Sequence, residues 1–139
     1  MGWTSKARRP AKAGATRKGR FRSALEATQA AILDQAGVKY GYEDETITYT
    51  VPSRTARYLI DFRLPNDIIV ETKGIFDAAD RQKHLLIREQ HPDRDIRFVF
   101  GNPNLPIYPG SPTTCAEWCD KHGFKWAGRV IPKAWLEEK

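Results

Sequence analysis

The chain has 139 residues, 40% of them hydrophobic and 29% charged, a composition typical of one globular domain. No apolar run approaches the roughly 18 residues of a membrane span, and the basic N-terminus is not followed by the apolar segment of a signal peptide. These features argue against a membrane or secreted protein and predict a cytoplasmic one, while the net charge of +6 favours a polyanionic partner.

The positive charge is concentrated in an N-terminal arm, predicted over residues 1–20, ahead of a single domain over 21–139. Residues 1–22 contain eight basic side chains and no acid, whereas the other 15 bases are outnumbered by all 17 acids. The arm lacks apolar periodicity, so we expect it to be disordered without a partner. Phosphate binding suits such an arm because each neutralised phosphate releases counterions; a solubilising tail is the alternative.

A first helix is predicted over about 23–36. Ser23 and Glu26 have the spacing of a capping box, apolar residues then follow at helical intervals, and Gly37 is a natural stop.

Runs of β-prone residues predict four strands in the next part of the chain. They cover residues 38–43, 46–51, 58–64 and 68–73. Pro52 ends the second strand or confines it to an edge.

Helix caps and prolines divide the remaining sequence into short elements. The predicted order is a helix from the N-cap Asp77 to about Gln90, a strand at 96–100, a loop at 101–112, a helix from Thr113 or Thr114 to His122 stopped by Gly123, a strand at 124–127, and a final helix with Pro132 at its first position. Helices alternating with strands in this way predict an α/β fold, a mixed sheet flanked by helices.

Cys115 and Cys119 are the only cysteines, and on a helix they would share a side with His122. A structural zinc site normally needs four ligands, and no second Cys or His cluster exists. We therefore predict reduced, packed thiols without a disulfide.

The most informative segment is the predicted hairpin around Asn66. Asp61 and Glu71 are equally far from this turn, so they become cross-strand neighbours with Cβ atoms about 5 Å apart. Lys73 follows Glu71 by two residues and projects from the same face. The opposite face is predicted to be core and carries Ile60, Phe62, Leu64, Ile68 and Val70.

Two neighbouring carboxylates repel one another unless a cation lies between them. Mg²⁺ prefers such oxygen ligands, and a nearby ammonium can orient water or stabilise charge on a phosphate. Glu26 is the candidate acid for a second ion, although its capping role competes. The alternative is a surface hairpin in which Lys73 and Arg63 form salt bridges with the two carboxylates.

Basic residues near this hairpin and in the arm are the candidate DNA contacts, although a solvated helix face is an equal alternative for those at 80–88. They are Arg17, Lys18, Arg20, Arg22, Arg81, Lys83 and Arg88.

Several ordered segments between Phe21 and Leu136 resemble the endonuclease I family of T-odd podophages (the T-seven type), Holliday-junction resolvases of the PD-(D/E)xK nuclease superfamily. The segments are residues 21–26, 61–66, 70–74, 80–92, 110–113 and 117–123.

The resemblance implies four catalytic positions, Glu26, Asp61, Glu71 and Lys73, with the Thr72 backbone carbonyl in the metal shell. It also implies a restriction-endonuclease-like fold and an intertwined homodimer. In that dimer a strand at about 46–52 is exchanged, and each site receives Glu26 from the partner chain.

The expected function is therefore a Mg²⁺-dependent endonuclease, with Mn²⁺ as a substitute, that resolves four-way and branched DNA in the host cytoplasm. No membrane or small-molecule substrate is expected. The alternatives are a mismatch or sequence-specific nuclease of the same chemistry, and a basic DNA-binding protein without activity.

Overall fold

The computed structural model describes residues 20–51 and 53–139, so most of the predicted arm, with Arg17 and Lys18, lies outside the described residues, as does Pro52. The helices are α2 (Ala24–Gln35), α3 (Ala78–Gln90), α4 (Cys115–His122) and α5 (Lys133–Glu137). The strands are β1 (Gly41–Tyr42), β2 (Thr46–Val51), β3 (Arg54–Leu59), β4 (Phe62–Arg63), β5 (Ile68–Lys73), β6 (Asp95–Phe100) and β7 (Trp126–Gly128).

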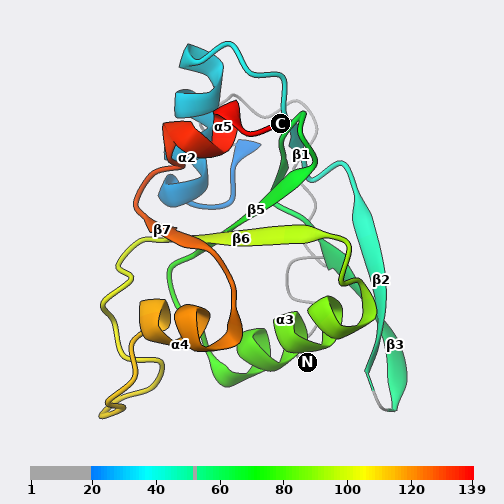
Figure 1. Ribbon diagram of the computed structural model, residues 1–139, viewed down its shortest axis with the longest axis vertical. Coiled ribbons are helices and arrows are strands. Elements are labelled where there is room, and N and C mark those ends of the chain that lie inside the picture. The colour runs from blue at the N-terminus through cyan, green and yellow to red at the C-terminus, as the bar shows by residue number, and fades with distance from the viewer. Residues whose placement is uncertain (1–19, 52) are drawn as a thin grey trace.

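The strands form one five-stranded sheet, in the order β1-β4-β5-β6-β7, and a separate β2-β3 hairpin. β1, β4 and β5 pair antiparallel, whereas β5, β6 and β7 pair parallel, so the sheet is mixed as predicted. Helices α2 and α5 cover one face and α3 and α4 the other (Figure 1). The predicted mixed sheet flanked by helices is confirmed.

Side chains alternate along the central strands between two apolar layers. Phe62, Val70 and Val99 pack with α2 and α5 through Leu33 and Trp135. The other layer, under α3 and α4, takes the neighbouring positions of the same strands, such as Ile69 and Phe98. All six residues of β5 are buried, as expected for a strand covered on both faces.

The predicted strand 58–64 is wrong in one respect: it is two strands, β3 and β4, interrupted at Ile60 and Asp61. Because the chain changes direction there, Ile60 does not share the core face of Phe62, as predicted, but packs in the layer of Ile69. The interruption places Asp61 between the two strands, outside the ladder of either.

Smaller corrections concern the ends of elements. The first strand is only Gly41–Tyr42, and the last is Trp126–Gly128. Pro132 is the N-cap of α5 and not its first residue. The caps of the two middle helices are confirmed: Asp77 caps α3, and Thr114 forms a complete capping box with Glu117 on α4.

A buried glutamine attaches α2 to the segment after β7. The Gln29 side chain donates to the Arg129 carbonyl at 2.6 Å and accepts from the Ile131 amide at 2.8 Å. Gln29 is 0% exposed, so both contacts are shielded from water. They fix the position of the helix that carries Glu26.

Both cysteines are free and buried, which confirms the predicted packed thiols. Burial raises the pKa of Cys119 to about 12 and also raises that of Cys115, so both stay protonated at neutral pH. In the described part of the chain, no helix combines the length and apolar character of a membrane span.

Candidate metal centre

Asp61 lies in the break between β3 and β4, at the end of a hairpin whose register is the predicted one. Phe62 pairs with Val70, and Asp61 is the next residue beyond this ladder. Its Oδ2 accepts hydrogen bonds from the Thr72 amide at 2.8 Å and from Thr72 Oγ1 at 3.0 Å. The carboxylate is 0% exposed, so β5 holds it in one orientation.

Glu71 and Lys73 project from the same face of β5, as predicted. Lys73 Nζ lies 3.4 Å from Glu71 Oε2 and 3.0 Å from Asp80 Oδ1, at the start of α3. The other oxygen of Glu71, Oε1, accepts a 2.9 Å hydrogen bond from the Tyr58 hydroxyl. The lysine is thus positioned between the sheet and a helix N-terminus.

The alternative of a surface hairpin, with Lys73 and Arg63 paired to the two carboxylates, is wrong in its exposure and in the role of Arg63. Asp61 and Glu71 are both 0% exposed. Arg63 pairs instead with Asp44 and Glu45 on the outside of the sheet. Lys73 does pair with Glu71, but in a buried setting where desolvation makes an unbalanced charge costly.

Glu26 is also buried, at 3% exposure, on the first turn of α2. Ser23 caps this helix by accepting from the Glu26 amide. The Glu26 carboxylate accepts from the Arg22 amide at 3.0 Å and from the Tyr42 hydroxyl at 2.6 Å. Glu26 therefore lies at the helix start, as predicted, with its carboxylate turned toward the sheet.

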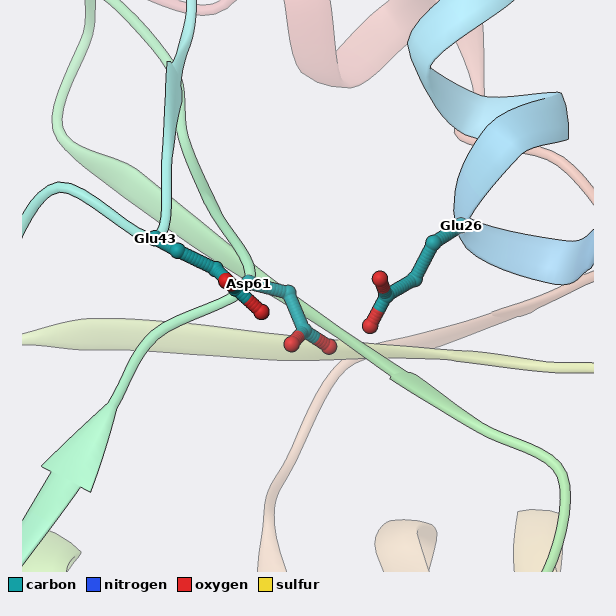
Figure 2. Close-up of side chains that lie close together, drawn as sticks. All are labelled: Glu26, Glu43 and Asp61. Carbon is teal, nitrogen blue, oxygen red and sulfur yellow. The ribbon is translucent and has the colours of Figure 1, made fainter. Parts of the chain in front are cut away.

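The structure adds a fourth acid that the sequence interpretation missed. Carboxylate oxygens of Glu26, Glu43 and Asp61 all lie within 4.8 Å of one another. Figure 2 shows the three side chains converging, with Asp61 between the other two. The acidic triplet at 43–45 is the only signal in the sequence, and nothing in it indicates which acid turns inward.

Two buried tyrosines donate hydrogen bonds to carboxylates of the site: Tyr42 to Glu26, and Tyr58 to Glu71. Burial, reinforced by the hydrogen bond to Glu26, raises the pKa of Tyr42 far above its ordinary value. Burial also raises the pKa of Tyr58, together with the negative charge of Glu71 and Asp61. Both hydroxyls therefore stay protonated at neutral pH and donate to the carboxylates.

The donor set fits a hard divalent cation. Glu26, Asp61 and Glu71 supply only oxygen atoms, they are almost fully buried, and they carry like charges that a cation offsets. A Mg²⁺ or Mn²⁺ ion matches that chemistry, whereas the described residues of the cluster provide no sulfur or imidazole ligand.

The candidate DNA contacts are placed unequally. Arg20 is exposed, with its guanidinium 5.5 Å and 5.6 Å from the ring centres of Phe21 and Tyr42. Arg22 is half-buried and forms a 3.1 Å ion pair with Glu43. Arg22 thus contacts a carboxylate of the cluster, and Arg20 lies against the ring of Tyr42, whose hydroxyl donates to Glu26.

The side chains of the three candidates on α3 make contacts within the protein. Lys83 is 1% exposed, with its ammonium 5.0 Å from the Tyr58 ring centre, a placement that speaks against the predicted phosphate contact. Arg81 donates to the carbonyls of Phe76 and Ile107, so it holds a loop to the helix. The Arg88 guanidinium stacks on the ring of Phe124, 4.2 Å from its centre, and the residue remains partly exposed.

The fold and the site together define an α/β domain with a buried carboxylate centre suited to a divalent cation. Comparison with known proteins gives the family. The sequence profile described as phage endonuclease I matches residues 7–139. Endonuclease I of Escherichia phage T7 is 47% identical over 125 residues, 90% of this chain and 84% of that protein.

Endodeoxyribonuclease 1 of Enterobacteria phage T3 is 49% identical over 118 residues, 85% of this chain and 78% of that protein. The chain belongs to the phage endonuclease I family.

Proposed function

We propose that this protein is a Mg²⁺-dependent endodeoxyribonuclease that resolves four-way and other branched DNA junctions by paired phosphodiester hydrolysis. The observation that carries the proposal is a set of buried carboxylates in a chain whose relatives are named endonucleases. Oxygens of Glu26, Glu43 and Asp61 lie within 4.8 Å of one another, and Glu71, on β5, pairs with Lys73. Mn²⁺ is expected to replace Mg²⁺, because both accept oxygen ligands.

Asp61 and Glu71 would hold the first ion, and Glu26 would help to hold a second. The backbone carbonyl of Thr72 is the further proposed ligand. The Lys73 carbonyl accepts from Gly101 on the β6 side of the strand, and carbonyls alternate along a strand. The Thr72 carbonyl therefore points to the other side of β5, toward β4, where the Thr72 amide donates to Asp61.

A bound divalent cation would polarise the phosphate and acidify a water molecule. The residues of the chain supply positioning. Lys73, held by Glu71 and Asp80, presents its ammonium to the attacking water or to the phosphate oxygens, where negative charge develops during in-line attack. The buried tyrosines Tyr42 and Tyr58 donate to Glu26 and Glu71 and so keep these two carboxylates aligned.

We further propose a two-fold homodimer in which the strand at about 46–52 is exchanged, so that Glu26 of one chain would serve the site of its partner. In the single chain β2 pairs with β3, and Glu26 already lies beside its own Asp61. An exchange would reproduce these contacts between two chains. Two sites related by symmetry suit paired nicks on a four-way junction.

The proposed DNA contacts are the arm with Arg17 and Lys18, the site-side residues Arg20 and Arg22, and Arg88 at the edge of α3. Phosphate contacts of this kind fix position without reading sequence. Selectivity would then come from the shape of branched DNA.

The test is cleavage of an immobile synthetic four-way junction against a linear duplex of the same sequence, with Mg²⁺ or EDTA. Paired, Mg²⁺-dependent nicks confined to the junction, and lost in Glu71→Ala, are expected. Equal cutting of both substrates would leave a nuclease without junction selectivity. A fixed cut site on linear duplex would instead favour the mismatch or sequence-specific alternative.

A further inference from the structure

The side chain of Glu43 is buried, unlike that of the neighbouring acid Asp44. Its side chain is 5% exposed, whereas that of Asp44, the next residue, is 39% exposed. One oxygen of Glu43, Oε2, pairs with Arg22 at 3.1 Å. The other, Oε1, is buried and has no hydrogen-bond partner among residues 20–51 and 53–139. A buried carboxylate oxygen without a donor is costly and requires a reason.

The backbone directs this side chain inward. Glu43 has a φ of +51°, a left-handed conformation that costs energy in a residue with a Cβ atom and that is enriched at functional sites. Its amide donates to the Asp61 carbonyl at 3.1 Å. The turn is therefore tied to the residue before β4, and it brings the Glu43 carboxylate to the side of Asp61 opposite Glu26 (Figure 2).

We infer that Glu43 is a metal-binding residue: with Glu26 and Asp61 it forms a three-carboxylate site for the second divalent cation. The inference rests on the proposed function and deepens it. Three carboxylates whose oxygens lie within 4.8 Å repel one another strongly at low solvent exposure, and a cation turns that repulsion into attraction. Asp61 belongs to both proposed ligand sets, so it would be shared by the two ions.

Arg22 supplies the competing explanation, in which Glu43 only forms an ion pair. The two explanations predict different changes in metal affinity when the Arg22 side chain is removed. If Glu43 binds a cation, the Arg22 guanidinium competes with that cation, and its removal leaves metal binding unchanged or tighter. If the pair only shapes the turn, removing either partner disturbs the site alike. The Arg22 amide, which donates to Glu26, is unaffected by substitution of the side chain.

The experiment is a Mn²⁺ titration of the full chain without DNA, with free Mn²⁺ followed by electron paramagnetic resonance. The proteins are wild type, Glu43→Gln, Arg22→Met and, as a matched control, Asp44→Asn. Asp44 carries the same charge one residue away but pairs with Arg63 outside the cluster. Circular dichroism establishes that each variant is folded.

Glu43→Gln is expected to weaken one class of Mn²⁺ sites at least about tenfold, the scale of effect that groups around a metal exert. Asp44→Asn is expected to bind as wild type, and Arg22→Met as tightly or more tightly. Wild-type binding in Glu43→Gln overturns the inference.

If Glu43→Gln does not fold, Arg22→Met decides, because weakened binding in that variant overturns the inference and retained binding supports it. Junction cleavage by wild type is scored separately, so the proposed nuclease function can stand when the role of Glu43 fails.

Discussion

The hydroxyl of Tyr58 donates a 2.9 Å hydrogen bond to Oε1 of Glu71, and neither side chain is exposed to solvent. Tyr58 comes from the β2-β3 hairpin, whereas Glu71 comes from the central sheet. The bond therefore links the two sheets at a carboxylate of the proposed active site. Its environment keeps the phenol protonated, because burial and the charge of Glu71 raise the pKa of Tyr58.

Tyr58→Phe is expected to reduce both stability and junction cleavage. The substitution keeps the ring and removes one donor to a buried carboxylate, which typically costs about 1–3 kcal/mol. Urea unfolding measures the stability change, and single-turnover cleavage measures the activity. Tyr49→Phe is the matched control, because Tyr49 is a second buried tyrosine of the same hairpin, whereas the hydroxyl that donates to Glu71 is that of Tyr58. An equal activity loss in both variants would contradict the specific role of Tyr58.

Asp80→Asn is expected to lower the cleavage rate about tenfold while leaving Mn²⁺ binding unchanged, because Asp80 positions Lys73 and is not a proposed ligand. Single-turnover cleavage and a Mn²⁺ titration test this prediction. Asp93→Asn, at an exposed acid after α3, is the control. A loss of metal affinity in Asp80→Asn would show that the site itself had changed.

Asp61→Asn is expected to abolish cleavage and, at the same time, to stabilise the metal-free protein by up to about 1 kcal/mol. The amide oxygen can still accept from Thr72, while the repulsion between neighbouring carboxylates is relieved. Thermal unfolding in EDTA and in Mg²⁺ measures both effects. Wild type should gain stability with Mg²⁺ and the variant much less. A variant that is less stable than wild type in EDTA would count against like-charge repulsion in the centre.

Stability should fall in acid as the ion pair between Arg97 and Glu138 is lost. The hydrogen bond from Arg97 lowers the pKa of Glu138 from its ordinary value of 4.5. A carboxyl with a lowered pKa stabilises the fold above that ordinary value, and the contribution disappears as pH falls through the lowered pKa. Unfolding of wild type and Glu138→Gln between pH 7 and pH 2 tests this. The two curves should differ at neutral pH and converge in acid.

Local signals predicted the helices and the active-site hairpin well. The caps at Ser23, Asp77 and Thr114 are short-range features that the structure confirms. The hairpin register followed from one turn and from alternation along two strands. The grouping of Glu71 and Lys73 on one face needed nothing more than this alternation.

The parts that were missed depend on contacts between distant segments. Glu43 reaches the site through a left-handed turn that only its tie to Asp61 makes evident. Lys83 was expected on an exposed helix face, as a DNA contact or as a solvated residue, but the β2-β3 hairpin covers it, with Tyr58 against its ammonium. Charge and helical spacing predict exposure for a lysine, and they carry no information about what packs above it.

The contacts of Gln29 have a consequence for how the protein becomes active during synthesis. The helix that carries Glu26 is made early, but its buried anchor is the backbone at Arg129 and Ile131, about a hundred residues further along the chain. A nascent chain that does not yet contain residues 129–131 has no partner for the Gln29 side chain, so α2 cannot pack fully in its final position. We therefore expect translation intermediates that lack this segment to be inactive, so that DNA near the ribosome is not cut until residues 129–131 have been made.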